Sequence, residues 1–213
     1  MTDTNESNKN AIKIVLIGNS GVGKTCISQK YINENKEIDL EVTSTIGASY
    51  FQKFLEIDGK NLSLDIWDTA GQERYRSMGK MFYKDAYIVL FVYDITDLKS
   101  FEELQNVWYP ELTNAGEKNA VLAVVGNKSD LFEKEQVNEE DARNWAKQIG
   151  AIFGLVSAKT GDCIQELFEN CVKKYLSSDF IAEIKKEKRN KGEAKKIESN
   201  NINNNNKKKK KCC

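Results

Sequence analysis

Six short apolar runs recur along the chain of 213 residues, and the segments between them repeat apolar residues at helical spacing. Several runs are almost continuously apolar, which is typical of strands in a sheet covered on both faces. The predicted strands are Ile12–Ile17, Tyr50–Ile57, Leu62–Trp67, Tyr87–Tyr93, Val121–Gly126 and Ile152–Val156. The predicted helices are Lys24–Asn33, Ser100–Asn114, Asn138–Ile149 and Ile164–Ser177. This alternation predicts an α/β fold, an open sheet with helices on both faces.

Turn and cap signals refine this pattern. Asp58-Gly59 stands between two runs of alternating character, which predicts a hairpin and an antiparallel pairing of the second and third strands. The expected sheet is therefore six-stranded and mostly parallel, with one antiparallel strand. Ser100 precedes Glu103 by three residues, which is a capping-box pattern for the start of a helix. Pro110 predicts a kink or an early end late in that helix.

Charge divides the chain into an acidic body and a basic end. The formal net charge is zero, yet residues 181–213 hold 12 Lys or Arg against 4 Asp or Glu, a net of +8, so the rest carries −8. This asymmetry disfavours nucleic acid as a partner and favours attraction of the end to an anionic surface. We expect a flexible N-terminus at 1–10, a folded domain at 11–179 and a disordered basic tail at 180–213, because the tail is too polar to fold alone.

The five cysteines show neither zinc-ligand spacing nor a C-x-x-C motif. Cys26, Cys163 and Cys171 lie in or beside predicted helices, and we expect them to be reduced, buried thiols of a cytosolic protein. The sequence contains no signal-peptide pattern and no apolar run of the roughly 18–20 residues that a membrane span needs.

The segment Gly18–Thr25 fits the pattern G-x-x-x-x-G-K-[ST], after a predicted strand and at the start of a helix. Glycines let backbone N–H groups wrap a phosphate chain, and the helix N-terminus adds partial positive charge. Lys24 would contact the terminal phosphates, and Thr25 would offer its hydroxyl to Mg²⁺. The alternative, an ordinary glycine-rich turn, is disfavoured by the flanking strand and helix.

Asp68 follows the predicted strand Leu62–Trp67, at the edge of an open sheet where ligands bind. It can hold Mg²⁺ through water, although an aspartate at a strand end is usually just a solvated cap. The residues that follow Asp68, up to Gln72, favour the metal-binding interpretation over the solvated cap. Gly71 can offer a backbone N–H near a terminal phosphate, and Gln72 can orient an attacking water.

The segment Asn127–Asp130 follows another apolar strand and is a candidate base site. The Asp130 carboxylate can accept from two guanine donors that adenine lacks, so it would reject ATP. Asn127 can bridge the base and a neighbouring loop, and Lys128 can lay its stem over the ring. Ser157–Lys159 could add a backbone N–H. Taken alone, Asn127–Asp130 could be an N-cap loop before a helix. Ser157–Lys159 is only a tripeptide and by itself is a weak signal of nucleotide binding.

In this order the motifs resemble those of the Ras-like small GTPases, from Ile14 to about Tyr175. The segments Trp67–Tyr75 and Tyr93–Thr96 and the final Cys212-Cys213 are similar to the Rab family of membrane-traffic regulators. The segment Ser44–Tyr50 is similar to the endocytic branch of that family.

The resemblance implies bound GTP or GDP with Mg²⁺, and it assigns roles to three sets of residues. The catalytic set is Gln72, Gly71 and Lys24, and the metal set is Thr25, Thr45 and Asp68. The nucleotide-binding set is Ser20, Gly21, Val22, Gly23, Lys24, Thr25, Cys26, Thr45, Gly71, Asn127, Lys128, Asp130, Ser157, Ala158 and Lys159. Thr45 would close on Mg²⁺ and the γ-phosphate within a first switch, and residues 68 to about 80 would form a second.

The chain departs from the Rab pattern near its first switch. Residues 31–45 are about two residues longer than is usual, and no aromatic lies between Tyr31 and Tyr50 to cover the guanine edge. Ile38 or Leu40 would cover it instead, or the base would be more exposed.

The family's Phe–Trp–Tyr triad for effector recognition corresponds here to Tyr50, Trp67 and Phe82, with two members exchanged. The effectors of this chain therefore need not be those of its relatives.

Lys207–Lys211 followed by Cys212-Cys213 is either a solvated polar terminus or a membrane anchor. The C-a-a-X pattern does not fit, because Lys210 occupies its cysteine position. The double cysteine resembles the Rab substrate for two geranylgeranyl groups, which together give stable attachment.

The resemblance also implies an exchange factor, a GTPase-activating protein, a GDP-dissociation inhibitor and effectors as partners. It implies a monomer in the cytosol and on the cytoplasmic face of an intracellular, endosomal membrane.

Two functions of other classes are weighed against a GTP-hydrolysing switch in vesicle traffic. A non-catalytic nucleotide-bound scaffold is disfavoured by the presence of Thr45, Gly71 and Gln72. A P-loop ATPase or nucleotide kinase is disfavoured by Asp130. The switches contain no evident arginine finger, so hydrolysis should be slow and should need an activating protein.

Overall fold

The computed structural model describes residues 11–33, 45, 47–57, 59–71, 82–115 and 120–177. Several predictions fall outside these residues. They concern the N-terminus at 1–10, most of the first switch, Gln72 and the rest of the second switch, the tail at 180–213, Cys212 and Cys213.

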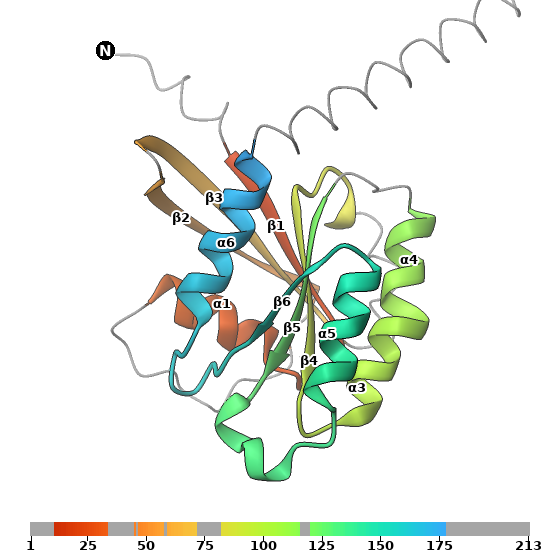
Figure 1. The fold of residues 1–213 in the computed structure, drawn as a ribbon. Coiled ribbons are helices and arrows are strands. Elements are labelled where there is room, and N and C mark those ends of the chain that lie inside the picture. Colours follow the sequence, from red (N-terminus) through yellow and green to blue (C-terminus); the bar gives the residue numbers. More distant parts are fainter. Residues whose placement is uncertain are drawn as a thin grey trace, which may run out of the picture. The chain divides into compact units, whose positions relative to one another are not determined.

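A six-stranded sheet with the strand order β2-β3-β1-β4-β5-β6 forms the centre of the fold (Figure 1). Its strands are β1 (Ala11–Ile17), β2 (Ala48–Ile57), β3 (Lys60–Thr69), β4 (Ile88–Asp94), β5 (Val121–Asn127) and β6 (Ile152–Leu155). Among these strands, β2 and β3 pair antiparallel and all other neighbours pair parallel. The predicted mostly parallel sheet with one antiparallel strand is confirmed.

The predicted hairpin joins β2 and β3. The two strands pair from Ala48 opposite Thr69 to Ile57 opposite Lys60, and Gly59 in the turn has a left-handed φ of +71°. Both strands extend beyond the apolar runs in the sequence, because ladder hydrogen bonds continue through polar residues. As a result Asp68 lies within the end of β3 rather than beyond it.

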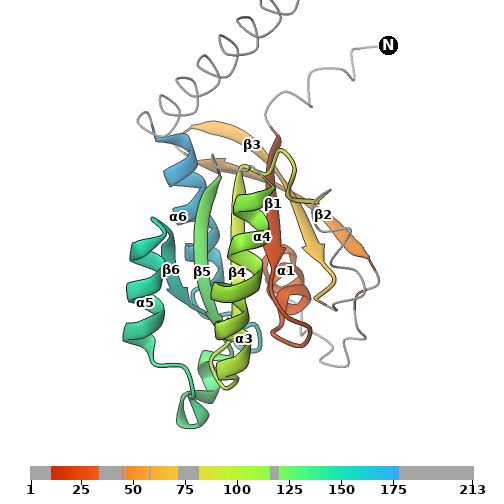
Figure 2. The same ribbon diagram turned by 90° about the vertical axis from the view of Figure 1, so that its right-hand side faces the viewer.

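Helices cover both faces of the sheet, as predicted (Figure 2). One face carries α1 (Lys24–Ile32) and α6 (Ile164–Leu176), and the other carries α3 (Leu98–Glu103), η2 (Leu104–Trp108), α4 (Tyr109–Asn114) and α5 (Glu139–Gln148). A short 3-10 helix, η3 (Ser129–Lys134), follows β5. None of the helices that the structure describes is long and apolar enough to cross a lipid bilayer.

Aromatic side chains fill the core on the α3–α5 side of the sheet. Phe91 and Tyr93 project from β4 and are fully buried, and Trp108 and Trp145 reach them from the helices. Trp145 meets Phe101 edge to face, with ring centroids 5.6 Å apart. This packing fixes the carboxyl ends of the parallel strands, which is where the candidate site lies.

The start of the α3 segment differs from the capping-box prediction. Asp97 is the N-cap, and its side chain accepts a hydrogen bond from the Lys99 N–H. Ser100 is fully buried inside the helix instead, where its hydroxyl donates to the Asp97 carbonyl and accepts from the Asp94 N–H. The capping-box prediction was wrong because an aspartate three residues earlier caps the helix first.

The helix does not end at Pro110. A π-helical turn, η2, ends at Trp108, and α4 begins at Tyr109 and continues past the proline to Asn114. The helical backbone is continuous across this position, and the missing proline N–H falls where the hydrogen bonds change from π to α spacing.

The three cysteines within the described part of the chain are free, but only one is buried as predicted. Cys171 is buried, Cys26 is half-buried and Cys163 is exposed. Cys163 stands in the turn before α6 with a left-handed φ of +57°, so its side chain is held outside the helix packing.

Candidate functional site

Glycines shape the loop between β1 and α1, and two of them are enforced by close contacts. Gly18 has a φ of +142°, and a Cβ there would lie 2.1 Å from the Val92 carbonyl oxygen. Gly23 has a φ of +93°, and a Cβ there would lie 2.2 Å from Asn127 Nδ2. No side chain fits at either position, because the loop runs directly against β4 and against the last residue of β5.

Lys24 begins α1 and is almost completely buried. Its Nζ donates to the carbonyl oxygens of Gly18 and Asn19, at 2.8 and 2.7 Å. Burial lowers the pKa of Lys24 to about 8, and the charge of Asp68 opposes that shift. The ammonium group therefore stays largely protonated at neutral pH, within the loop predicted to wrap the phosphates.

Thr25, Thr45 and Asp68, the predicted metal set, lie together although they come from α1, the first switch and β3. Thr25 Oγ1 donates to Asp68 Oδ2 at 2.5 Å and lies 3.0 Å from Thr45 Oγ1, which is 3.4 Å from the same carboxylate oxygen. Burial raises the pKa of Asp68, opposed by the hydrogen bond from Thr25, the charge of Lys24 and the hydrogen bond from Thr45.

This donor set fits Mg²⁺. All three side chains offer hard oxygen atoms. Asp68 Oδ1 is buried and has no hydrogen-bond partner among the described residues, so it can accept from a metal-bound water. The described residues contain no cluster of three or more His, Cys, Asp or Glu suited to a metal ion. A site with one carboxylate is typical of Mg²⁺, which keeps several waters and takes further ligands from phosphates.

Gly71 lies two residues after the end of β3. It packs against the loop between β1 and α1, which we call the phosphate loop. A Cβ at Gly71 would lie 2.3 Å from the Asn19 carbonyl carbon and from the Ser20 nitrogen. The backbone that leads to Gln72 therefore starts in contact with the loop. Gln72 lies outside the described residues, so its predicted catalytic position stays a prediction.

Asn127 ends β5 and joins three loops through its buried side chain. Its Nδ2 donates to the Val22 carbonyl at 2.8 Å, and its Oδ1 accepts from the Ala158 N–H at 3.0 Å. The candidate base site is thereby tied to the phosphate loop on one side and to the Ser157–Lys159 segment on the other.

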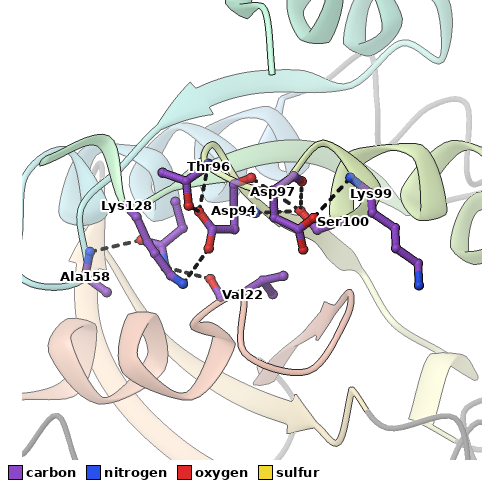
Figure 3. Close-up of polar contacts among 9 residues, drawn as sticks. Val22, Asp94, Thr96, Asp97, Lys99, Ser100, Lys128 and Ala158 are labelled. Atoms are coloured by element: carbon purple, nitrogen blue, oxygen red, sulfur yellow. Dashed lines mark hydrogen bonds and ion pairs between the residues drawn. The ribbon is translucent and has the colours of Figure 1, made fainter. Parts of the chain in front are cut away.

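Asp130 and Lys128 are each held in place by a second polar group. Ser157 donates to Asp130 Oδ1 at 2.7 Å, and Lys159 Nζ lies 3.9 Å from Oδ2. Lys128 has a left-handed φ of +66°, and its Nζ lies 2.5 Å from Asp94 Oδ2 (Figure 3). This ion pair fixes the end of the lysine stem that was predicted to cover the base.

Asp94 was not predicted as a site residue. Its Oδ1 accepts from the Thr96 N–H and hydroxyl, and its Oδ2 pairs with Lys128 (Figure 3). The signal in the sequence is its place directly after the apolar run that ends at Tyr93, which matches the place of Asp68 after Trp67.

The three aromatic residues predicted as an effector triad form one cluster. The Trp67 ring centroid lies 5.3 Å from that of Tyr50 and 5.9 Å from that of Phe82. Tyr50 is about half exposed and Trp67 is partly buried, so the cluster presents an aromatic edge to solvent.

Comparison with known proteins identifies the class to which this fold and site belong. Residues 13–177 match the Ras family. Ras-related protein Rab-21 from Geodia cydonium is 41% identical over 167 residues, which are 78% of this chain and 72% of the relative. Human Ras-related protein Rab-22A is 39% identical over 168 residues, 79% of this chain and 85% of the relative. Ras-related protein RABF2b from Arabidopsis thaliana is 38% identical over 156 residues, 73% of this chain and 76% of the relative.

The chain therefore belongs to the Ras family of small GTPases, and within it to the Rab proteins. Like other members of that family, it hydrolyses GTP. The alternatives of a non-catalytic scaffold and of an ATPase or nucleotide kinase are set aside.

Proposed function

We propose that this protein is a switch that binds GTP or GDP with Mg²⁺, hydrolyses GTP slowly and recruits effectors to membranes in vesicle traffic. The observation that carries the proposal is the convergence of Thr25, Thr45 and Asp68, because it joins the phosphate loop, the first switch and β3 around one donor set. Thr45 has a role there only when its switch closes. The site thus supports two states, one with the γ-phosphate bound and one without it.

In this proposal the chain's own residues hold the phosphates. Backbone N–H groups of Ser20, Gly21, Val22 and Gly23 face the phosphate chain, with those of Lys24, Thr25 and Cys26 at the start of α1. Lys24 Nζ exchanges its carbonyl partners for phosphate oxygens. When bound, Mg²⁺ would neutralise charge on the phosphates. Gly71 offers its N–H to the γ-phosphate, and Gln72 orients the attacking water rather than removing its proton, since a neutral amide is a poor base.

Guanine is selected by Asp130. Its carboxylate accepts from the guanine N1–H and 2-amino group, and adenine would leave that charge unpaired. Lys128, held by Asp94, covers one face of the ring. A backbone N–H of the Ser157–Lys159 segment, which Asn127 ties to the base site, donates to the guanine oxygen.

The remaining parts of the proposal rest on resemblance to Rab proteins. Cys212 and Cys213 carry geranylgeranyl groups, and the basic tail at 180–213 strengthens attachment to an anionic leaflet. A guanine-nucleotide exchange factor, a GTPase-activating protein, a GDP-dissociation inhibitor and effectors act on a monomer. The protein moves between the cytosol and the cytoplasmic face of an endosomal membrane, and nucleic acid is not a partner.

Release of fluorescent GDP and of a non-hydrolysable GTP analogue, with Mg²⁺ or with a chelator, tests this function on the full chain. Thr45→Ala should weaken the effect of Mg²⁺ on release of the GTP analogue and leave GDP release nearly unchanged. Thr113→Ala, in α4, is the matched control. Equal competition by ATP, or release that ignores Mg²⁺ in the wild type, would contradict the proposal.

A further inference from the structure

Trp108 connects η2 to the phosphate loop through one hydrogen bond. Its indole Nε1–H donates to Asn19 Oδ1 at 2.8 Å, across 89 residues of sequence. Trp108 is 1% exposed, so the donor end of this bond lies in the core, and the acceptor Asn19 is half-buried. Asn19 is not among the residues predicted to bind nucleotide, and Trp108 was predicted only as part of a helix.

The Asn19 peptide touches two parts of the catalytic site. Its carbonyl oxygen accepts from Lys24 Nζ at 2.7 Å. Its carbonyl carbon and oxygen lie so near Gly71 that a Cβ there would approach them to 2.3 and 2.5 Å. The orientation of the Asn19 peptide therefore affects the positions of both Lys24 and Gly71.

The π turn determines where Trp108 points. It inserts one residue relative to an α-helix, which turns the following side chains by about 100° around the helix axis. Trp108 is the last residue of that turn, and the Tyr109 N–H bonds to the Leu104 carbonyl five residues earlier. Helical turns of this kind occur often at functional sites, where they aim a particular side chain.

We propose that Trp108 is a positioning residue for GTP hydrolysis, acting through Asn19 on Lys24 and Gly71. This inference rests on the proposed roles of those two residues at the terminal phosphate. The indole N–H holds the Asn19 side chain, and thereby its peptide, so that Lys24 and the Gly71 N–H stay aligned when the γ-phosphate is present. The bond should matter more for the GTP state than for the GDP state, because Gly71 has a phosphate partner only in the former.

Trp108→Phe keeps an aromatic ring in the core but removes the N–H. We expect single-turnover hydrolysis of GTP to slow by about threefold to tenfold, the effect of one hydrogen bond. Release of a non-hydrolysable GTP analogue should accelerate more than release of GDP. Trp145→Phe is the matched control, since Trp145 packs in the same core against Phe101 and Tyr109. It should lower stability while both nucleotide measurements stay within about twofold of the wild type.

Asn19→Ala gives an independent test that does not disturb the core, because Asn19 is only half-buried. It should reproduce the Trp108→Phe effects, and the double variant should be no worse than either single variant. Equal behaviour of Trp108→Phe and Trp145→Phe, or additive effects of Asn19→Ala and Trp108→Phe, would overturn the inference. Wild-type protein that binds no guanine nucleotide would instead overturn the proposed function.

Discussion

In the proposed function a single side chain, Asp130, selects the base. Its Oδ1 accepts from Ser157 at 2.7 Å, and Lys159 lies near Oδ2, so the carboxylate is oriented before any ligand arrives. An amide at this position could still accept from Ser157, so the loop should keep its form when the charge is removed.

Asp130→Asn should therefore weaken GTP binding by at least about a hundredfold and shift preference toward xanthine nucleotides. Xanthine has a carbonyl where guanine has the 2-amino donor, and a side-chain amide can donate to it. Competition between GTP and XTP for the purified variant measures the shift. Retained guanine preference would remove Asp130 from base recognition.

The environments of Cys163 and Cys171 predict opposite reactivity. Burial raises the pKa of the Cys171 thiol to about 12, so it stays protonated below about pH 11, whereas Cys163 is exposed. Between pH 7 and 9, an alkylating reagent should modify Cys163 within minutes and Cys171 only after unfolding. Peptide mass spectrometry measures both sites in one sample. Labelling of Cys171 in the folded protein would contradict the burial of its thiol.

The elements themselves follow closely from the sequence, and their ends follow less well. The apolar runs of β1, β4 and β5 predicted those strands within one residue, because strands buried on both faces leave little ambiguity. The start of α3 was misplaced, because Asp97 and Ser100 both have capping chemistry and only the fold decides between them. The π turn could not be predicted, since buried positions at Leu104, Trp108 and Leu112 also suit an α-helix.

Ser100→Ala tests the role that the structure gives to this serine. The substitution leaves the Asp94 N–H without its side-chain acceptor in a fully buried position. We expect a loss of about 1–3 kcal/mol in the free energy of unfolding. Urea denaturation measures it, with Thr113→Ala as the control, because among the described residues the Thr113 hydroxyl bonds within its own helix, to the carbonyls of Tyr109 and Pro110. An equal, small change in both variants would contradict this role.

Over the whole molecule, the order of motifs predicted which loops meet. The contacts that hold those loops in place depend on tertiary packing and could not be predicted. Thr25, Thr45 and Asp68 could be assembled from the sequence because each lies at a recognisable motif. Asp94 and Asn19 could not, because their partners Lys128 and Trp108 are distant in sequence and meet only through the packing of β4 and η2.

The proposed lipid anchor and the basic tail at 180–213 together predict attachment to membranes. Replacing Cys212 and Cys213 with Ser should make the protein cytosolic while GTP binding and hydrolysis persist, because neither residue lies within 13–177, the part that matches the Ras family. Neutralising Lys207–Lys211 should weaken attachment less, since each lysine contributes about 1 kcal/mol near an anionic leaflet. Cell fractionation and mass spectrometry of the C-terminal peptide give the answer. An unmodified peptide from membrane-bound wild type would refute the lipid anchor.

Asn127 has a consequence for how long a nucleotide stays bound. Its amide joins Val22 and Ala158, so any of the three loops that moves alone leaves a buried polar group unpaired, at about 1–3 kcal/mol. Asn127→Ala should shorten the residence time of GDP by about tenfold or more, which stopped-flow fluorescence can measure. An unchanged residence time would show that the loops open independently. With the bridge intact, we expect the base and the phosphates to be released together, so a protein that displaces any one of these loops should release the entire nucleotide.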